Sequence, residues 1–220
     1  PDSFLNTSNS YVNEKRAMIN IGIVKTDDFP TIKAYVSTSG TDITDRDNIV
    51  ISDCGSVIED YTIEKVHYSS SQIFLACDNS GSMSGDIEAL KTAVSKFVES
   101  KNAKEKIGII AFDSSVLSNT GLSKDDKLLQ DAIDSFSSGG GTYIGSGVDA
   151  AFEGISSSEN SFNVIIVMTD GQDSSFATDA ALNELRQRCI ENNVVLYTIG
   201  LGDVSADYLQ NATAAALSVA

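Results

Sequence analysis

The 220-residue sequence is poor in the side chains that bind zinc or form disulfide frameworks, with one histidine and three cysteines. Cys54, Cys77 and Cys189 form no C-x-x-C pair, and His67 stands apart from them, so we expect no structural zinc site. Cys77 ends an apolar run and Cys189 lies on the apolar side of a helical pattern. Both are therefore predicted to be small core residues rather than reactive thiols.

Basic side chains are also scarce, because 15 Lys and Arg stand against 31 Asp and Glu, for a formal net charge of −16. Residues 1–71 carry 6 basic and 11 acidic side chains, and the remainder carries 9 and 20, so most of the acidic excess lies in the second part. Nucleic acids and anionic lipids are bound by clustered Lys and Arg. We therefore expect no nucleic-acid partner.

Long apolar runs are missing as well: none approaches the ~20 residues that a membrane helix needs. Residues 1–11 have neither the basic start nor the hydrophobic core of a signal peptide. Pro1 is not an initiator Met, so we expect a processed chain or part of a longer one, in which an export signal would precede this numbering. No direct membrane insertion is predicted.

The first part of the chain has the composition of short strands. Segments rich in Ile, Val and Tyr alternate with turn-forming clusters such as 39–42 and 53–56, and helical periodicity is absent. Residues 1–71 are therefore predicted to form a small β-rich module resembling a partial sandwich. Its strands are expected at 17–25, 31–37, 48–52 and 61–66.

From Gln72 onward, apolar strands alternate with amphipathic helices, which is the βαβ pattern. Because the strands are almost continuously apolar, the sheet should be covered by helices on both faces and be mostly parallel. We therefore predict the α/β fold class for residues 72–217, as a doubly wound sheet that binds ligands at the carboxyl ends of its strands. Strands are expected at 73–77, 107–112, 164–168 and 194–199, and helices at 87–98, 124–136, 145–155, 177–192 and 203–216.

Directly after the first of these strands, the sequence Asp78-Asn79-Ser80-Gly81-Ser82 places a carboxylate and two hydroxyls at alternate positions. Alternate residues of an extended segment point the same way. Carboxylate and hydroxyl oxygens are hard ligands that suit Mg²⁺ or Mn²⁺ better than zinc. Asp78, Ser80 and Ser82 are therefore candidate ligands of a divalent cation.

Two further segments bring oxygen donors to the same edge. The apolar strand 164–168 is followed by Thr169-Asp170-Gly171, so Asp170 could face Asp78, and Thr142 follows three glycines that permit close backbone approach. Taken one at a time, these features are better explained by helix capping and ordinary loops than by a metal site.

In combination, the D-x-S-x-S pattern at 78–82, the loop threonine and the T-D-G sequence at 169–171 resemble the von Willebrand factor type A (vWA) domain with its metal-ion-dependent adhesion site (MIDAS). The resemblance implies a Rossmann-like vWA fold and one bound divalent cation, Mg²⁺ or else Mn²⁺ or Ca²⁺. It implies that hydroxyls bind the cation and that the two carboxylates act directly or through water. The implied metal-site residues are Asp78, Ser80, Ser82, Thr142 and Asp170.

The same resemblance implies the function. In this family a carboxylate of the partner protein typically fills the last coordination position, so the expected partner is a protein that presents an acidic side chain. Gly81-Ser82-Met83 and the preceding β-rich stretch are similar to bacterial members of the family. The implied role is that of an extracellular or cell-surface adhesion module, as in a bacterial surface protein.

Enzymes form the competing class. A phosphohydrolase of the haloacid dehalogenase type resembles D-x-D-x-T/V, but Ser80 stands where its second Asp would be. A serine hydrolase would need a G-x-S-x-G elbow and a base, yet His67 precedes the α/β part, where we expect it to be structural. No phosphate-binding or dinucleotide-binding glycine motif follows a strand. We therefore predict a binding protein without catalytic activity, while a structural assembly module with a vestigial metal site remains an alternative.

Overall fold

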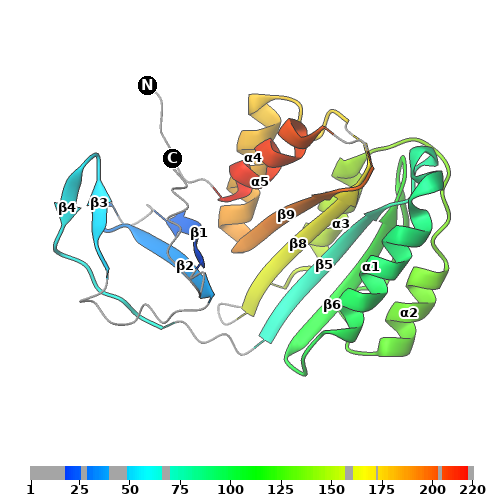
Figure 1. The fold of residues 1–220 in the computed structure, drawn as a ribbon, viewed down its shortest axis with the longest axis horizontal. Helices are drawn as coiled ribbons and strands as arrows, with labels where there is room; N and C mark the ends of the chain where they lie inside the picture. Colours follow the sequence, from blue (N-terminus) through cyan, green and yellow to red (C-terminus); the bar gives the residue numbers. More distant parts are fainter. Residues whose placement is uncertain are drawn as a thin grey trace, which may run out of the picture. The chain divides into compact units, whose positions relative to one another are not determined.

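The computed structural model describes residues 18–25, 29–39, 49–65, 70–156, 161–171, 173–202 and 205–217 (Figure 1). The chain divides into two compact units, residues 1–67 together with Ala220 and residues 68–219. His67, for which a structural role was expected, lies outside the described residues.

The first unit contains two small antiparallel sheets. Strand β1 (Met18–Lys25) pairs with β2 (Lys33–Ser39), and β3 (Ile51–Asp53) pairs with β4 (Ser56–Ile58). Cys54 and Gly55 connect β3 to β4 with φ angles of 47° and 84°. Two consecutive positive φ angles match the twist of a two-residue hairpin turn.

The prediction of a strand at 61–66 is wrong for residues 61–65, which belong to no strand. Val66 lies outside the described residues. The Tyr61 hydroxyl instead donates to the Ile49 carbonyl oxygen at 3.0 Å. Residues 53–56 were expected to form only a turn, and β4 was not predicted because a strand of three residues is too short to show an alternating pattern.

The second unit is built on a five-stranded sheet with the order β7-β6-β5-β8-β9. The strands β5, β6, β8 and β9 are parallel, and β7 pairs antiparallel with β6 at one edge. This arrangement confirms the predicted fold class. The edge strand β7 was not predicted, because its residues are mostly exposed and lack an apolar run. The strands are β5 (Ser70–Asp78), β6 (Glu105–Phe112), β7 (Val116–Asn119), β8 (Ser161–Thr169) and β9 (Val194–Gly200).

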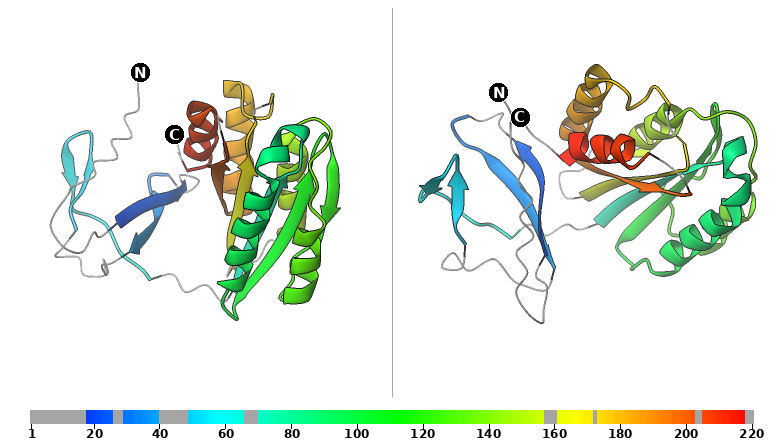
Figure 2. Two further views of the ribbon diagram at one scale, coloured as in Figure 1. Left: turned by 45° about the vertical axis from the view of Figure 1, so that its right-hand side comes forward. Right: turned by 45° about the horizontal axis from the view of Figure 1, so that its top comes forward.

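Helices cover both faces of this sheet (Figure 2). Alternate residues of β5 divide the core, since Ile73 and Leu75 pack with α1 and α2, whereas Phe74 packs with α3. Cys77 and Cys189 are both buried in this core, as predicted. The helices are η2 (Gly81–Gly85, 3₁₀), α1 (Ile87–Glu99), α2 (Asp126–Asp134), α3 (Ile144–Gly154), α4 (Asp179–Asn192) and α5 (Ala206–Leu217).

Helix α5 also closes the outer edge of β9. The backbone N–H of Thr198 donates to Thr213 Oγ1 at 3.2 Å, and Thr198 Oγ1 donates to the Leu209 carbonyl oxygen at 3.0 Å. An N–H at a sheet edge is normally left for water or another strand. Here a side chain of the covering helix satisfies it.

The sheet order creates a topological switch point between β5 and β8. From β5 the chain crosses to β6 on one side, and it later returns to β8 on the other side. In open parallel sheets, ligands bind outside the carboxyl ends of the two strands at this point. Asp78 ends β5, and Asp170 directly follows β8.

Candidate metal centre

Asp78 is the buried carboxylate of the candidate site, with no exposed surface. The parallel register pairs Cys77 with Met168, so Asp78 comes level with Thr169 on the neighbouring strand. Thr169 Oγ1 donates to Asp78 Oδ2 at 2.5 Å, and the Ser80 backbone N–H donates to Asp78 Oδ1 at 2.8 Å. Both carboxylate oxygens therefore have fixed positions. Thr169 was named only as part of a motif, and its bond to Asp78 was not foreseen.

Two serine hydroxyls connect Asp78's segment to Asp170. Ser80 Oγ lies 3.1 Å from Ser82 Oγ, and Ser82 Oγ donates to Asp170 Oδ1 at 2.8 Å. Ser80 has the expected extended backbone, but Ser82 already lies in the first turn of η2. The turn therefore brings Ser82 toward β8, where a continuously extended segment was expected. Ser80 is buried and Ser82 is exposed, so this row of oxygens opens to solvent.

The glycine-rich loop 139–141 packs directly against this segment. The Gly139 N–H donates to the Asn79 carbonyl oxygen at 2.8 Å, and the Gly81 N–H donates to the Gly140 carbonyl oxygen at 3.1 Å. Gly140 has a φ of 71°, and a Cβ there would lie 2.2 Å from Asp113 Oδ2. Both the positive φ and this contact require glycine. The close approach that the glycines predicted is therefore present.

Thr142 lies at the other end of this loop, beside the segment that follows β8. A Cβ built on Gly171 would lie 3.5 Å from Thr142 Oγ1, so the Thr142 side chain lies on the side of Gly171 where a larger residue would place its Cβ. Hydrogen bonds connect Asp78 to the Ser80 N–H, Ser80 Oγ to Ser82 Oγ, and Ser82 Oγ to Asp170. Thr142 is near them without joining that network among the described residues.

The site is electrostatically unbalanced. Burial raises the pKa of Asp78 most strongly, and the negative charge of Asp170 raises it further, while hydrogen bonds from Thr169 and Ser80 oppose the shift. The ion pairs found among the described residues include neither of these two aspartates. A buried carboxylate without a cation is costly.

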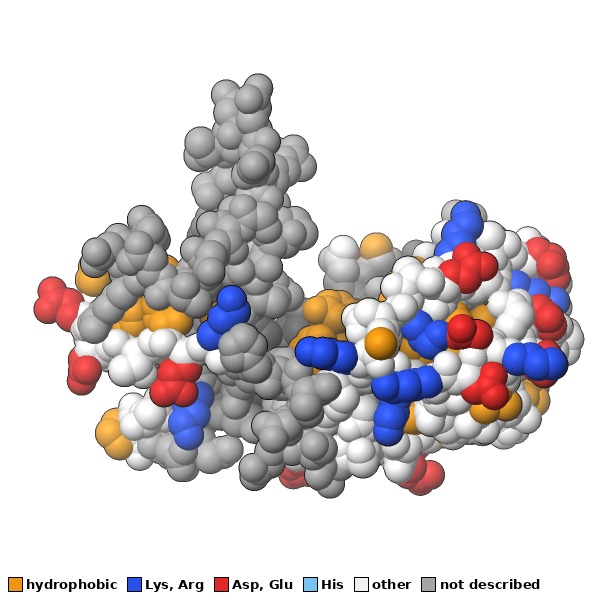
Figure 3. All heavy atoms as spheres, turned by 90° about the horizontal axis from the view of Figure 1, so that it is seen from below, with side chains coloured by type: hydrophobic (Ala, Val, Ile, Leu, Met, Phe, Trp, Pro, Cys, Tyr) orange, Lys and Arg blue, Asp and Glu red, His pale blue; other side chains and the backbone are white. Residues whose placement is uncertain are grey.

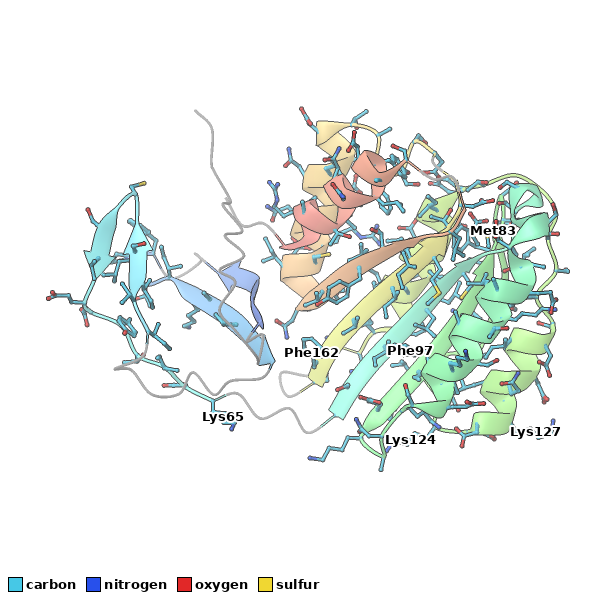
Figure 4. The ribbon with its side chains drawn as sticks, viewed as in Figure 1. Lys65, Met83, Phe97, Lys124, Lys127 and Phe162 are labelled. Atoms are coloured by element: carbon cyan, nitrogen blue, oxygen red, sulfur yellow. The ribbon has the colours of Figure 1, made fainter. Side chains whose placement is uncertain are left out.

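The loops around the site add no compensating charge. The segments 79–86, 113–115, 137–143 and 170–178 contain no Lys, Arg or His. At the amino ends of the strands, opposite the candidate site, three lysines are exposed: Lys104, Lys106 and Lys124. The pairing of Ile107 with Ser123 places Lys106 beside Lys124. Figure 3 views this edge and shows its Lys and Arg side chains. In Figure 4, Met83 of η2 and Lys124 mark the two opposite edges.

The donor set fits a hard divalent cation. All five candidate side chains offer carboxylate or hydroxyl oxygen, which suits Mg²⁺, Mn²⁺ or Ca²⁺. Among the residues that the structure describes, no group of three or more His, Cys, Asp or Glu side chains could hold a metal ion. Any cation at this edge would therefore depend on the hydroxyls as well as the two carboxylates.

Fold and site together define the class of this protein: a doubly wound α/β domain with an oxygen-lined site at its switch point. Residues 72–217 match the model of the von Willebrand factor type A domain, and the chain therefore belongs to this family. The family often mediates metal-dependent protein interactions and consists generally of non-enzymatic interaction modules. Among curated proteins, none matches this chain in sequence.

Solved structures share this fold. A von Willebrand factor type A protein from Catenulispora acidiphila has a TM-score of 0.58 and 22% identity, covering 67% of this chain and 37% of that one. The conserved hypothetical protein BatB from Bacteroides thetaiotaomicron has a TM-score of 0.57 and 18% identity, covering 67% and 87%. Proximal thread matrix protein 1 from the mussel byssus, solved with a zinc-occupied MIDAS motif, has a TM-score of 0.54 and 20% identity, covering 67% and 42%.

At these identities the similarity establishes the fold. The chain spans less than half the length of the Catenulispora and mussel proteins. None of the helices in the described part of the chain is long and apolar enough to cross a membrane.

Proposed function

We propose that residues 72–217 form a metal-dependent protein-binding module without catalytic activity, preceded by a separate β-rich module at residues 1–71. In this proposal Mg²⁺, or Mn²⁺ or Ca²⁺ in its place, is held at the carboxyl edge of the sheet, and a carboxylate of the partner protein completes its coordination. The residues proposed to hold the cation are Asp78, Ser80, Ser82, Thr142 and Asp170.

The observation that carries this proposal is the buried carboxylate of Asp78. It has no exposed surface, and it forms none of the ion pairs found among the described residues. A neighbouring carboxylate, Asp170, is joined to it through two serine hydroxyls. Such a group is retained at a cost in stability unless a cation offsets it. A divalent cation bound here supplies the positive charge that the surrounding loops lack.

The hydroxyl ligands explain why the partner would contribute a carboxylate. Ser80, Ser82 and Thr142 are neutral, so they leave the charge of a divalent cation incompletely balanced. The exposed Ser82 marks the side open to solvent, from which a partner's side chain could approach. Without metal the acidic loops would repel that carboxylate, so binding should require the cation.

We also propose an extracellular or cell-surface location, as expected for an adhesion module and for a bacterial surface protein. The structures with a similar fold include an aerotolerance-related membrane protein from Bacteroides fragilis and the matrix protein of the mussel byssus. Labelling of intact source cells with an antibody against residues 72–217 tests this location, and labelling only after lysis would refute it.

Calorimetric titration of the full chain with Mg²⁺ and Mn²⁺ tests the metal site. We expect saturable binding of one ion, loss of binding in Asp78→Ala, and unchanged binding in Asp134→Ala. Asp134 is a suitable control because it is an exposed carboxylate on α2 whose side chain, among the described residues, accepts a hydrogen bond from Gln130 of the same helix. Absence of binding to the parent chain at millimolar metal would favour a vestigial site in a structural module.

The partner's chemistry needs a second experiment. Peptides selected from a random library on the Mg²⁺-loaded protein should contain an Asp or Glu whose replacement by Asn or Gln abolishes binding. They should dissociate when the metal is chelated. Peptides that bind equally well without metal would contradict the proposed mode. Asp78-dependent hydrolysis of a generic phosphate ester would instead favour the phosphohydrolase alternative.

A further inference from the structure

Asp173 is a second carboxylate beside the candidate site, three residues beyond Asp170, and it has a complete set of hydrogen-bond donors. Asp173 Oδ2 accepts from the Ile144 N–H and from Ser175 Oγ, both at 2.8 Å. Asp173 Oδ1 accepts from the Ser175 N–H and from the Tyr208 hydroxyl, also at 2.8 Å. These donors come from three different segments of the chain.

The first of these segments is the start of helix α3, which has no side-chain cap of its own. Its N-cap residue, Tyr143, makes no side-chain capping bond. The first two helical N–H groups donate instead to the loop after β8, from Ile144 to Asp173 and from Gly145 to Ser175 Oγ at 2.8 Å. A carboxylate is also favoured at the positive end of a helix. The position of α3 therefore depends on a loop distant in sequence.

The second segment is helix α5, which contributes Tyr208. Its hydroxyl donates to Asp173 Oδ1 and also accepts from the Asp173 N–H at 3.2 Å. The Tyr208 ring packs at 5.6 Å from the Phe176 ring, centroid to centroid, which holds the phenol in place. Asp173 is thus fixed from the side of α5 while it holds α3.

Thr142 lies two residues before α3, and its position depends on the segments that contact its backbone. Its side chain lies beside Gly171, 3.5 Å from where a Cβ on that glycine would be, and among the described residues it does not join the hydrogen-bonded network of Asp78, Ser80, Ser82 and Asp170. On the side of β6 the backbone around Thr142 is held by the loop after that strand, since the Gly141 N–H donates to Ser114 Oγ at 3.0 Å and the Tyr143 N–H donates to the Asp113 carbonyl oxygen at 2.8 Å. On the side of Asp170, the start of α3 is the element that can fix the distance from Thr142 to Asp170.

We propose that Asp173 is a positioning residue for the candidate metal site: by holding the first turn of α3 against the loop after β8, it places Thr142 beside Asp170. This proposal rests on the proposed function, since it assumes that Thr142 binds the cation. Replacing an outer group that orients a metal ligand typically weakens metal binding by about 10–100-fold.

A graded set of variants tests this role through the affinity for Mn²⁺. Asp173→Asn keeps the side chain's size but loses one acceptor oxygen, and we expect it to weaken Mn²⁺ binding by about 10–100-fold. Tyr208→Phe removes one of the four donors and should weaken binding by less. Asp149→Asn is the matched control, because Asp149 also fixes α3, through an ion pair with Arg188 of α4 at 2.6 Å, but lies beyond the first turn of the helix and does not bond to the loop that carries Asp173 among the described residues. It should bind Mn²⁺ like the parent chain.

A double-mutant cycle separates positioning from general destabilisation. If Asp173 acts through Thr142, then Asp173→Asn should change Mn²⁺ affinity by less than about twofold when Thr142 is already replaced by Val. Weak affinities in this cycle can be measured from the dependence of Tm on Mn²⁺ up to tens of millimolar. Tm without metal, recorded in parallel, reports the stability loss on its own.

The outcomes distinguish this inference from the proposed function. If the parent chain binds no metal, the proposed function fails and the inference with it. If the parent chain binds Mn²⁺ and Asp173→Asn binds equally well, only the positioning role is overturned. An undiminished effect of Asp173→Asn in the Thr142→Val background would likewise assign Asp173 a structural role alone.

Discussion

Replacement of Asp78 by Asn should stabilise the metal-free protein and abolish its response to metal. The carboxylate is fully buried, and its pKa is raised chiefly by that burial. A raised pKa means that the neutral form is preferred more in the folded chain than in the unfolded chain. The asparagine amide is neutral at every pH and nearly the same size. Its side-chain oxygen can still accept from the Ser80 N–H. Its NH₂ group can donate to the Thr169 hydroxyl, which can rotate to accept.

The magnitude follows from two opposing effects. Replacing two hydrogen bonds to a charged acceptor by neutral ones costs about 1 kcal/mol each. The variant also avoids the desolvation of a buried ion, which raises its stability by several kcal/mol. The direction of the pKa shift indicates that desolvation dominates, so a net gain of about 1–3 kcal/mol is expected, or roughly 2–4 °C in Tm for each kcal/mol.

The assay is thermal unfolding of parent and Asp78→Asn chains in chelator and in Mg²⁺. At a metal concentration 1,000 times Kd, the parent should gain about 4.1 kcal/mol and the variant nothing, so the order of stability should reverse. The destabilising effect of the charged Asp78 is present at neutral pH and fades as pH falls through its raised pKa toward 3.8. The difference in free energy of unfolding between the metal-free parent and Asp78→Asn chains should therefore narrow over the same pH range. A variant less stable than the parent in chelator at pH 7 would refute the reasoning.

Two further predictions concern the core of the same unit. Gly108→Ala would place a Cβ 2.2 Å from Phe74 Cε1, so urea unfolding should show a loss of about 1–3 kcal/mol, and adding Phe74→Leu should recover part of it. Alkylation of the native chain at pH 8, followed by mass spectrometry, should modify exposed Cys54 alone, because burial raises the pKa of Cys77 and raises that of Cys189 to about 12. In denaturant all three should react, and rapid native labelling of Cys77 would contradict its burial.

The sequence was most informative where apolar patterning is strong. The apolar runs ending at Cys77 and Met168 predicted the two central strands, because a strand covered on both faces leaves no polar position. Strand β7 carries no such run, since it lies at the edge with most of its residues exposed. The strand expected at 61–66 shows the opposite error, in which β-prone residues have no strand partner in the described part of the chain.

For the candidate site, the motif named the residues but not how they are connected. The prediction that Asp78 and Ser80 lie in an extended segment agrees with the structure. The 3₁₀ turn that carries Ser82 toward Asp170 was not predicted, because its short sequence shows no apolar periodicity. Asp173 was missed because its role depends on Ile144 and Tyr208, which are 29 and 35 residues away. Long-range hydrogen bonds of this kind leave no local periodicity to detect.

The contact between Thr198 and Thr213 has a consequence for solubility. A parallel sheet that ends in an apolar strand offers its free N–H groups to other chains, and edge-to-edge pairing of this kind begins aggregation. Because Thr213 Oγ1 accepts the Thr198 N–H, an incoming strand would have to displace α5 before it could add to β9. Helix α5 thus opposes the addition of another chain's strand at Thr198, on this edge of the sheet.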